Sequence, residues 1–378
     1  MTESRVAVLR TAPENVLNDY QTLLKLARAE KIFRERKRRI VVKLNLSWSL
    51  YFPACSTEPW QLEGVLKFLR KRGYENIVAV EDQTVVTHTW KGAYGNKWLP
   101  VLKKYGVEFK PLPNVEWKEH EPKSELLAFP KLFEKVLVPE IYPGSYILHL
   151  PTVKTHGHTI TTGAVKNAFG GLIPRYRHHA HKFIHEIMVD LVILQKEIFS
   201  GMLNVMDGTV AGDGAGPRTM NPRILNLILA SSDPVAIDAL AAKIMGFEPM
   251  EIPYLKMCHD MGLGIADVEQ IEIVGMDERE VLRMNFGFKT RKSPIIFFDQ
   301  LLRKGTMRFK PLHDFLFYSP VFKLFILASA IYHDYIWYPT VGKYRIRKFM
   351  RSEWGRLWKK YPYGEYPKNA YLREWDVY

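Results

Sequence analysis

The sequence predicts an α/β fold with a mostly parallel open sheet, helices on both of its faces, and a basic, aromatic-rich helical extension at the C-terminus. Short apolar runs alternate with stretches of helical periodicity over residues 1–275, which is the pattern of a parallel sheet covered by helices. Over residues 276–378 the alternation stops, and Arg, Lys and aromatic residues dominate. With 378 residues, 47% of them hydrophobic, the chain can bury a large core. We therefore predict an α/β domain over 1–275 and an extension over 276–378.

The individual elements follow from periodicity and from the residues that end each run. Leu62, Val65, Leu66 and Leu69 share one face of a helix, and Gly73 ends it. The other predicted helices cover residues 14–29, 183–196 and 233–244, with one more ending at 101–105. The predicted strands are 5–9, 40–46, 77–80, 107–112, 146–150, 202–206, 224–230 and 271–274.

Two compositional features limit the function classes. Cys55 and Cys258 are the only cysteines, so this chain alone can build neither a disulfide framework nor a cysteine-ligated iron–sulfur cluster. The N-terminus lacks the apolar run of a signal peptide. The longest apolar stretch, 320–332, contains Lys323 and is shorter than the ~18 residues of a spanning helix. These features predict a cytoplasmic protein, with peripheral membrane association as an open possibility.

The positive charge is concentrated near the C-terminus. The whole chain carries +14, and residues 301–360 hold 13 Lys and Arg against 3 Asp and Glu. Any polyanionic partner would therefore meet this region and not the α/β domain.

Polar residues that follow predicted strands are the first candidates for a site, because ligands of open α/β sheets gather at the carboxyl ends of the strands. We expect at least three of these groups to share one site. The groups are Lys43 with Asn45, Glu81 with Asp82, Lys154 with His156, Asp207 with Asp213, and Asp233.

The segment 146–177 contains the densest set of chemical groups. It is predicted as a strand followed by a loop, in which a neutral His156 would be a general base or metal ligand and Lys154 would hold an anion. The alternative is a surface loop with solvated histidines, and it weighs most for His158.

A second pair of groups, Lys166 with Asn167, lies downstream. Lys166 would neutralise a phosphate or carboxylate, and Gly170 and Gly171 would let backbone N–H groups approach it. The alternative is a helix terminus closed by Gly170. The spacing is not that of a P-loop, so no nucleotide site is predicted.

A divalent metal is a further hypothesis. Asp207 and Asp213 carry oxygen ligands for a hard cation, and the histidine cluster at residues 178, 179, 181 and 185 offers His179 as a third ligand. Turns and a solvated basic segment are the alternatives. Asp233 precedes Pro234 as an ideal helix N-cap, and Asp238 is either a ligand or an exposed residue.

Residues 343–360 are predicted to form a basic amphipathic helix. Phe349, Trp354 and Trp358 recur at helical spacing between Lys and Arg residues. Such a helix suits an anionic membrane surface. Nucleic acid is a less favoured partner, and packing of the aromatic stripe on the α/β domain is an equal alternative to the membrane.

Five segments resemble the DUF362 family, a domain of unknown function, in sequence and in order. They are VVKLNL at 41–46, LHLPTVKTHGHTITTGAVKNAFGG at 148–171, DGTVAGDGAGP at 207–217, SSDPVAIDALAAKIMG at 231–246 and EIPYL at 251–255. The resemblance implies an α/β domain but no reaction. Many relatives carry ferredoxin-like cysteine motifs for two iron–sulfur clusters, which this chain lacks. This argues against a self-contained electron-transfer role and leaves an external ferredoxin as an open alternative partner.

The candidate residues together favour an enzyme that acts on a small anionic substrate bearing a carboxylate or phosphate, with assistance from a metal and attachment to a membrane surface as further expectations. In this hypothesis Lys154, His156 and Lys166 carry the chemistry, and the substrate contacts Lys43, Asn45, Asn167, Gly170 and Gly171. The alternative is a non-catalytic protein that binds a metal, a cofactor or nucleic acid.

Overall fold

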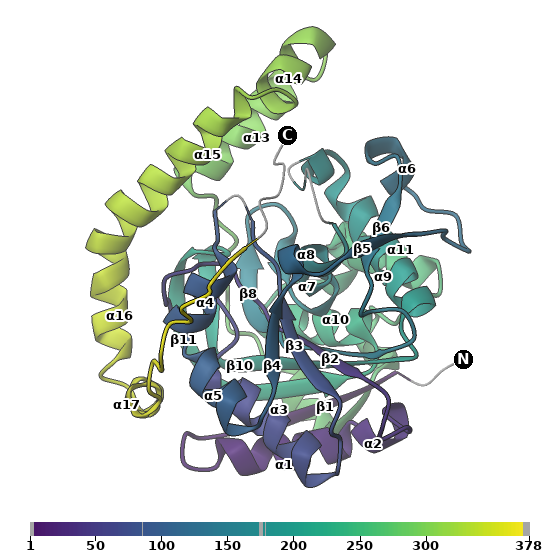
Figure 1. Cartoon of the computed structure of the whole chain (residues 1–378), viewed down its shortest axis with the longest axis vertical. Coiled ribbons are helices and arrows are strands. Elements are labelled where there is room, and N and C mark those ends of the chain that lie inside the picture. The colour runs from purple at the N-terminus through teal and green to yellow at the C-terminus, as the bar shows by residue number, and fades with distance from the viewer. Residues whose placement is uncertain (1–3, 85, 174–176, 178, 373–378) are drawn as a thin grey trace.

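A single twisted sheet forms the centre of the molecule (Figure 1). The structure is a computed structural model and describes residues 4–84, 86–173, 177 and 179–372. The strand order is β12-β1-β11-β10-β7-β2-β3-β4, with β8 and β9 attached beside β10. Within this sheet, β11 runs antiparallel to β1 and β10, β9 runs antiparallel to β8, and the other pairs are parallel. The predicted fold class is thus confirmed.

The strands and their bounds are as follows. In the main sheet they are β1 (Arg5–Arg10), β2 (Ile40–Lys43), β3 (Ile77–Glu81), β4 (Glu108–Pro111), β7 (Tyr146–His149), β8 (Thr152–His156), β9 (Ile160–Thr162), β10 (Gly201–Ala215), β11 (Thr219–Ser231) and β12 (Glu272–Gly275). β5 (Trp117–His120) and β6 (Val136–Pro139) form a separate antiparallel pair.

Helices cover both faces of the sheet. One layer contains α1 (Val16–Leu26), α3 (Pro59–Lys71) and α5 (Trp98–Lys104), and the other contains α9 (Ile184–Ile198), α10 (Pro234–Met245) and α11 (Pro253–Asp260). Within β2, Ile40 and Val42 face the first layer while Val41 faces the second, so both faces need apolar residues. The shorter helices are α2 (Ala29–Ile32), α4 (Thr89–Gly95), α6 (Phe129–Leu132), α7 (Ala164–Asn167), α8 (Phe169–Leu172) and α12 (Glu278–Leu282).

Two segments predicted as loops are in fact hairpins. The Lys/His/Thr segment after β7 forms β8 and β9, and the glycine-rich segment 207–217 lies mostly within β10, which pairs with β11. At Gly212 of β10 there is no room for a side chain, because a Cβ there would lie 2.2 Å from the Met220 sulfur. Glycine therefore marks close packing at this position and not a turn.

The C-terminal extension is helical. It comprises α13 (Pro294–Thr306), α14 (Lys310–Phe317), α15 (Phe322–Ala330), η5 (Ile331–Gly342), α16 (Lys343–Phe349) and α17 (Glu353–Lys360). α15, the π-helical η5 and α16 follow one another in a long rod beside the α/β domain (Figure 1). The single helix predicted over 343–360 is wrong, because it breaks after α16 and Ser352 caps the new helix α17.

The position of the site follows from the topology. β2 pairs with β3 on one side and with β7 on the other, so strands that follow β2 in the chain lie on both sides of it. Such a switch point opens a crevice at the carboxyl ends of the strands. Lys43, the last residue of β2, lies level with His149 of β7 and Val80 of β3.

Candidate active site at the carboxyl ends of the strands

A cavity of about 570 Å³ lies over the carboxyl ends of β2, β3 and β8. We call its polar side the floor, which includes Lys43, Asn45, Glu81, His156, Lys166, Asn167, Gly170, Arg177 and Arg218. We call the opposite side the roof, which α13 and α15 supply through Ile295, Ile296, Phe298, Asp299, Arg303, Phe322, Phe325 and Ile326. Its size is typical of small-molecule sites.

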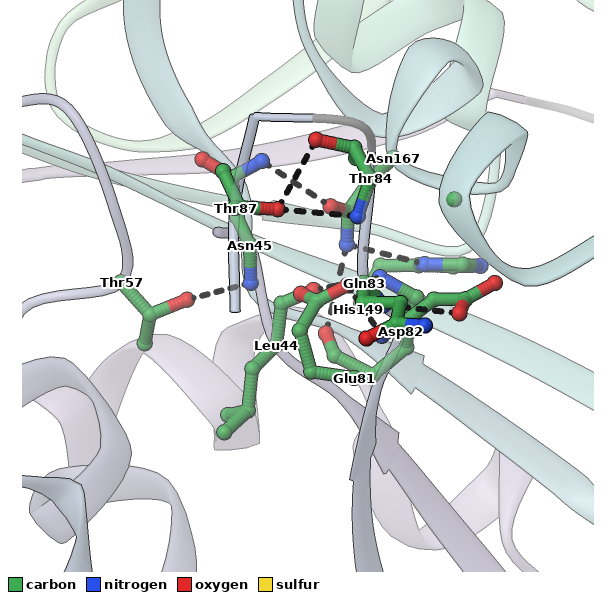
Figure 2. A network of polar contacts seen from close by, with 12 residues as sticks. Leu44, Asn45, Thr57, Glu81, Asp82, Gln83, Thr84, Thr87, His149 and Asn167 are labelled. Atoms are coloured by element: carbon green, nitrogen blue, oxygen red, sulfur yellow. Dashed lines mark hydrogen bonds and ion pairs between the residues drawn. The ribbon is translucent and has the colours of Figure 1, made fainter. Parts of the chain in front are cut away.

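A buried ion pair forms the base of the floor. Lys43 Nζ donates to Glu81 Oε1 at 2.7 Å and to the Leu44 carbonyl oxygen at 2.8 Å. Figure 2 shows Glu81 beside Asp82, whose backbone N–H also donates to Glu81 Oε1 at 2.8 Å. Glu81 Oε2 is buried without a hydrogen-bond partner among the described residues. Burial raises the pKa of Glu81, although Lys43 opposes this shift.

Gly170 and Gly171 lie directly over this ion pair. A Cβ on Gly170 would stand 3.5 Å from Lys43 Nζ, and one on Gly171 would stand 2.8 Å from the Tyr142 hydroxyl. Gly170 lines the cavity, whereas Gly171 does not. At Gly171, glycine is needed for the close approach of α8 to the base of the site.

A chain of side-chain hydrogen bonds stiffens the floor (Figure 2). Asn45 Nδ2 donates to Asn167 Oδ1 at 3.3 Å, and Asn167 Nδ2 lies 3.2 Å from His149 Nδ1. His149 Nε2 in turn lies 2.7 Å from Gln195 Oε1. Because the glutamine oxygen can only accept, Nε2 of His149 carries the proton and Nδ1 accepts. Burial lowers the pKa of His149 to about 3, so this histidine is neutral.

Lys154 does not line the cavity, but it contacts Asn45, which does. Its Nζ donates to Asn45 Oδ1 at 2.5 Å, to Thr152 Oγ1 at 2.6 Å and to the Cys55 carbonyl oxygen at 3.0 Å. All three donors of the ammonium group are thus used. Burial lowers the pKa of Lys154 to about 8. Its geometry fits a residue that orients Asn45 and not one that touches a ligand.

His156 lines the cavity as a hydrogen-bond donor. Its Nδ1 accepts from the backbone N–H groups of His158 at 3.1 Å and Thr159 at 3.3 Å. In the neutral ring the proton therefore sits on Nε2. Burial, with Lys166 as the next contribution, lowers the pKa of His156 well below its usual value. A general base or metal ligand would need a free lone pair on Nε2, which this arrangement does not offer.

Lys166 is a cation of the floor that α7 carries. It stands in α7, whose first N–H groups, those of Ala164 and Val165, donate to Asp238 at 2.6 and 3.1 Å. Its Nζ lies over the Phe169 ring, 4.9 Å from the ring centroid. Burial, followed by Arg177, lowers the pKa of Lys166 to about 8. Asp238, predicted as a ligand or an exposed residue, is a buried cap that positions Lys166.

Three arginines of the cavity were not predicted. Arg303 Nε donates to Asp299 at 2.9 Å, but its Nη1 and Nη2 are buried without hydrogen-bond partners among the described residues, and Arg218 Nη1 is in the same state. Arg177 forms an ion pair with Asp82, which lies behind the cavity wall. None of the three follows a predicted strand, so their position in the sequence does not mark them as residues of a strand-end site.

Several predicted residues lie elsewhere. Asp233 is the N-cap of α10 and accepts from Val235 N and Ala236 N. It therefore has the helix-capping role that its position before Pro234 predicted. Asp207 faces the layer of α1 and α3, where it accepts from the Tyr20 hydroxyl at 2.7 Å and from Trp60 Nε1 at 3.0 Å. Side chains alternate along a strand, and Asp207 falls on the same face as Val205, away from the cavity.

The structure does not bring the three metal candidates together. Asp213 accepts from the Lys289 backbone N–H at 2.9 Å and pairs with Arg223, whereas His179 contacts the ring of Tyr318. Within residues 4–84, 86–173, 177 and 179–372, no three His, Cys, Asp or Glu side chains are arranged to hold a metal ion. The predicted cluster also included His178, which lies outside the described residues.

The aromatic stripe of 343–360 packs on the α/β domain. Trp354 is buried against Trp60 and donates to Asn226 Oδ1 at 2.7 Å, and Trp358 stacks on Tyr51. No residue of this segment lines the cavity. Of the three alternatives for these aromatic residues, the geometry favours packing.

Comparisons with known proteins agree with the family resemblance. A thylakoid-associated protein of Synechocystis sp. is 27% identical over 213 residues, which cover 55% of this chain and 63% of that protein. This chain therefore spans less than two thirds of that relative's length. A crystal structure of a Thermotoga maritima protein is similar with a TM-score of 0.35 and 11% identity, over 60% of this chain and 57% of the other. The model of DUF362, a domain of unknown function, matches residues 40–243, and the chain belongs to this family.

Proposed function

We propose that the chain binds a small ligand bearing a phosphate or carboxylate in this cavity and acts on it as an enzyme. The observation that carries the proposal is a set of cations that line the cavity. Arg218 and Arg303 have buried N–H groups without hydrogen-bond partners among the described residues, and Lys166 lies against the Phe169 ring. Unpaired buried N–H groups of charged side chains are costly, and an anionic ligand would remove this cost. The neutral His156 would add one further N–H donor.

Lys166 and Glu81 are the proposed proton-transfer groups. Burial brings the pKa of Lys166 down to about 8 and raises that of Glu81, and both shifts are toward the pH at which general acids and bases work best. Glu81 Oε2 is free to accept a proton or a hydrogen bond from a ligand. In this proposal Lys154 is a positioning residue.

The test is the pH dependence of anion binding. Inorganic sulfate is a suitable probe because it keeps its charge near neutral pH. Lys166 is charged below pH 8 and neutral above it, so sulfate affinity measured by calorimetry should fall as the pH rises from 7 to 9. In Lys166→Met the affinity at pH 7 should fall by about tenfold, since a hydrogen bond to a charged group contributes about 1.5–3 kcal/mol.

Two matched variants separate Lys166 from its neighbours. Lys166→Arg stays charged through this range, so its sulfate affinity should not decline up to pH 9. Lys154 has the same pKa of about 8; if it caused the decline, Lys166→Arg would decline as well. Lys182→Met, at an exposed lysine nearby, should behave as the parent protein. Equal affinity in the parent and Lys166→Met would refute the proposed site.

We also propose that the protein associates peripherally with a membrane from the cytoplasmic side. The support is the name of the Synechocystis relative, which describes a thylakoid-associated protein, together with the exposed apolar residues of the C-terminal helices. Co-sedimentation of the purified chain with vesicles tests this part independently of ligand binding.

A further inference from the structure

The roof of the cavity has a second, outward-facing side that is apolar and exposed. Of the 21 exposed large hydrophobic residues of the described chain, 15 lie between Phe297 and Tyr344. Leu324 and Leu327 of α15 are 65% and 56% exposed, whereas Phe322 of the same helix is buried. So many exposed apolar side chains within one segment indicate an interaction site.

The charges around this apolar side indicate the kind of surface that it meets. Lys304, Arg308, Lys310 and Lys323 are exposed on α13–α15 or between them, and residues 301–360 contain few acids. Aromatic and aliphatic side chains beside Lys and Arg are typical of segments that lie in the interface of an anionic bilayer.

Among the described residues, no single helix is long and apolar enough to cross a membrane. Two helical segments, Lys310–Phe317 and Phe322–Phe349, meet at a bend of 49°. Taken together, this pair is long and apolar enough to cross a membrane by length and composition alone.

The cavity reaches the same apolar side. Phe298 lines the cavity and is also 58% exposed, so it stands where the interior of the cavity meets the outer surface. Ile295, Phe325 and Ile326 continue the apolar wall inward. The floor holds Lys166 and Arg218, and Arg303 reaches the cavity from α13 in the roof. One cavity thus combines cationic side chains with an apolar wall that continues to the exposed side of the roof.

We infer that the ligand is an amphiphile drawn from an anionic bilayer, with a phosphate or diphosphate head at the floor and a hydrocarbon chain against α13 and α15. The inference deepens the proposed function and rests on it. Five basic residues line the cavity, and Glu81, Asp299 and Asp82 behind the wall pair with three of them. The remaining two, Lys166 and Arg218, suit a head with more than one negative charge. The membrane contact thereby moves from 343–360 to the helices that form the roof.

The first experiment measures chain-length dependence with butyl, hexyl and octyl phosphate, all below their micelle concentrations, against inorganic phosphate. Affinity should rise with each methylene, by up to about fourfold. Phe325→Ser should weaken this rise, measured against the variant's own affinity for inorganic phosphate, with circular dichroism as the check on folding. Equal affinity for all alkyl phosphates would overturn the amphiphile, while loss of binding in Lys166→Met would still support the anion site.

The second experiment is flotation with phosphatidylcholine vesicles that contain phosphatidylglycerol. The full chain should float with the vesicles, and Leu324→Asp with Leu327→Asp should abolish flotation while octyl phosphate binding persists, because both residues face outward. Ile224→Asp, at a 44% exposed residue of β11, is the matched control and should float. A chain that does not float, or a double variant that floats as the parent does, would overturn the bilayer as the source of the ligand.

Discussion

The floor and the roof of the cavity are built in opposite ways. The floor stands at the ends of buried strands, where Lys43, Asn167 and His149 are each held by neighbouring side chains or backbone. The roof consists of α13 and α15, which have a buried side toward the cavity and a largely exposed apolar side.

This difference separates the roles of the two regions. A floor formed by core residues is rigid and can keep groups such as Lys166 unpaired, since the surrounding hydrogen bonds fix their positions. Helices with few contacts on one side have low local stability and can move to admit a ligand. Under the proposed function, the floor would select the head group and the roof would set how the ligand enters.

The largest effect on stability is expected from a substitution in the floor. Lys43→Met removes the partner of Glu81 and leaves a buried carboxyl group without its cation, at a cost of about 3–5 kcal/mol in the free energy of unfolding. The loss should be larger at pH 8 than at pH 5. The pKa of Glu81 is already raised and would rise further, so the folded state would hold a proton that the unfolded chain releases.

Chemical denaturation at the two pH values measures this loss. The double variant Lys43→Met with Glu81→Gln is the control, because it contains no buried charge at this position and should recover part of the stability. Equal stability of Lys43→Met and the parent protein would show that the ion pair does not hold the floor.

A middle effect concerns the support beneath Lys166. Asp238→Asn keeps the shape of the side chain but retains only one of the two oxygens that accept from Ala164 N and Val165 N. We expect a loss of about 1–3 kcal/mol and a weaker affinity for sulfate, since α7 carries Lys166. Asp260→Asn, at an exposed ion pair with Lys256, should change stability by less than about 0.5 kcal/mol. An unchanged sulfate affinity in Asp238→Asn would contradict the positioning role.

The smallest effect is expected on the outward side of the long rod. Tyr335 of η5 is 77% exposed, so Tyr335→Ser should alter the unfolding free energy in solution by about 0.5 kcal/mol or less. Trp337, two residues further, is buried against Trp48 and Phe52, and Trp337→Ala should cost about 3–5 kcal/mol. Similar losses in thermal or chemical unfolding of both variants would contradict an open outer side.

The sequence by itself determined the α/β class and much of the floor. Alternating apolar runs predict a covered parallel sheet, and polar residues at strand ends predict a shared site. Lys43, Asn45, Glu81, His156, Lys166, Asn167 and Gly170 do lie together around one cavity. Local periodicity carries this information because each strand has to bury both faces.

Only the tertiary structure decided which groups face the cavity and what covers it. Asp207 and Lys154 have the residue types of a site, but Asp207 falls on the opposite face of the sheet and Lys154 is saturated by Asn45 and its neighbours. Arg218 and Arg303 reach the cavity from a hairpin and from α13, far away along the chain. Such contacts depend on how distant segments pack, which neither residue type nor spacing records.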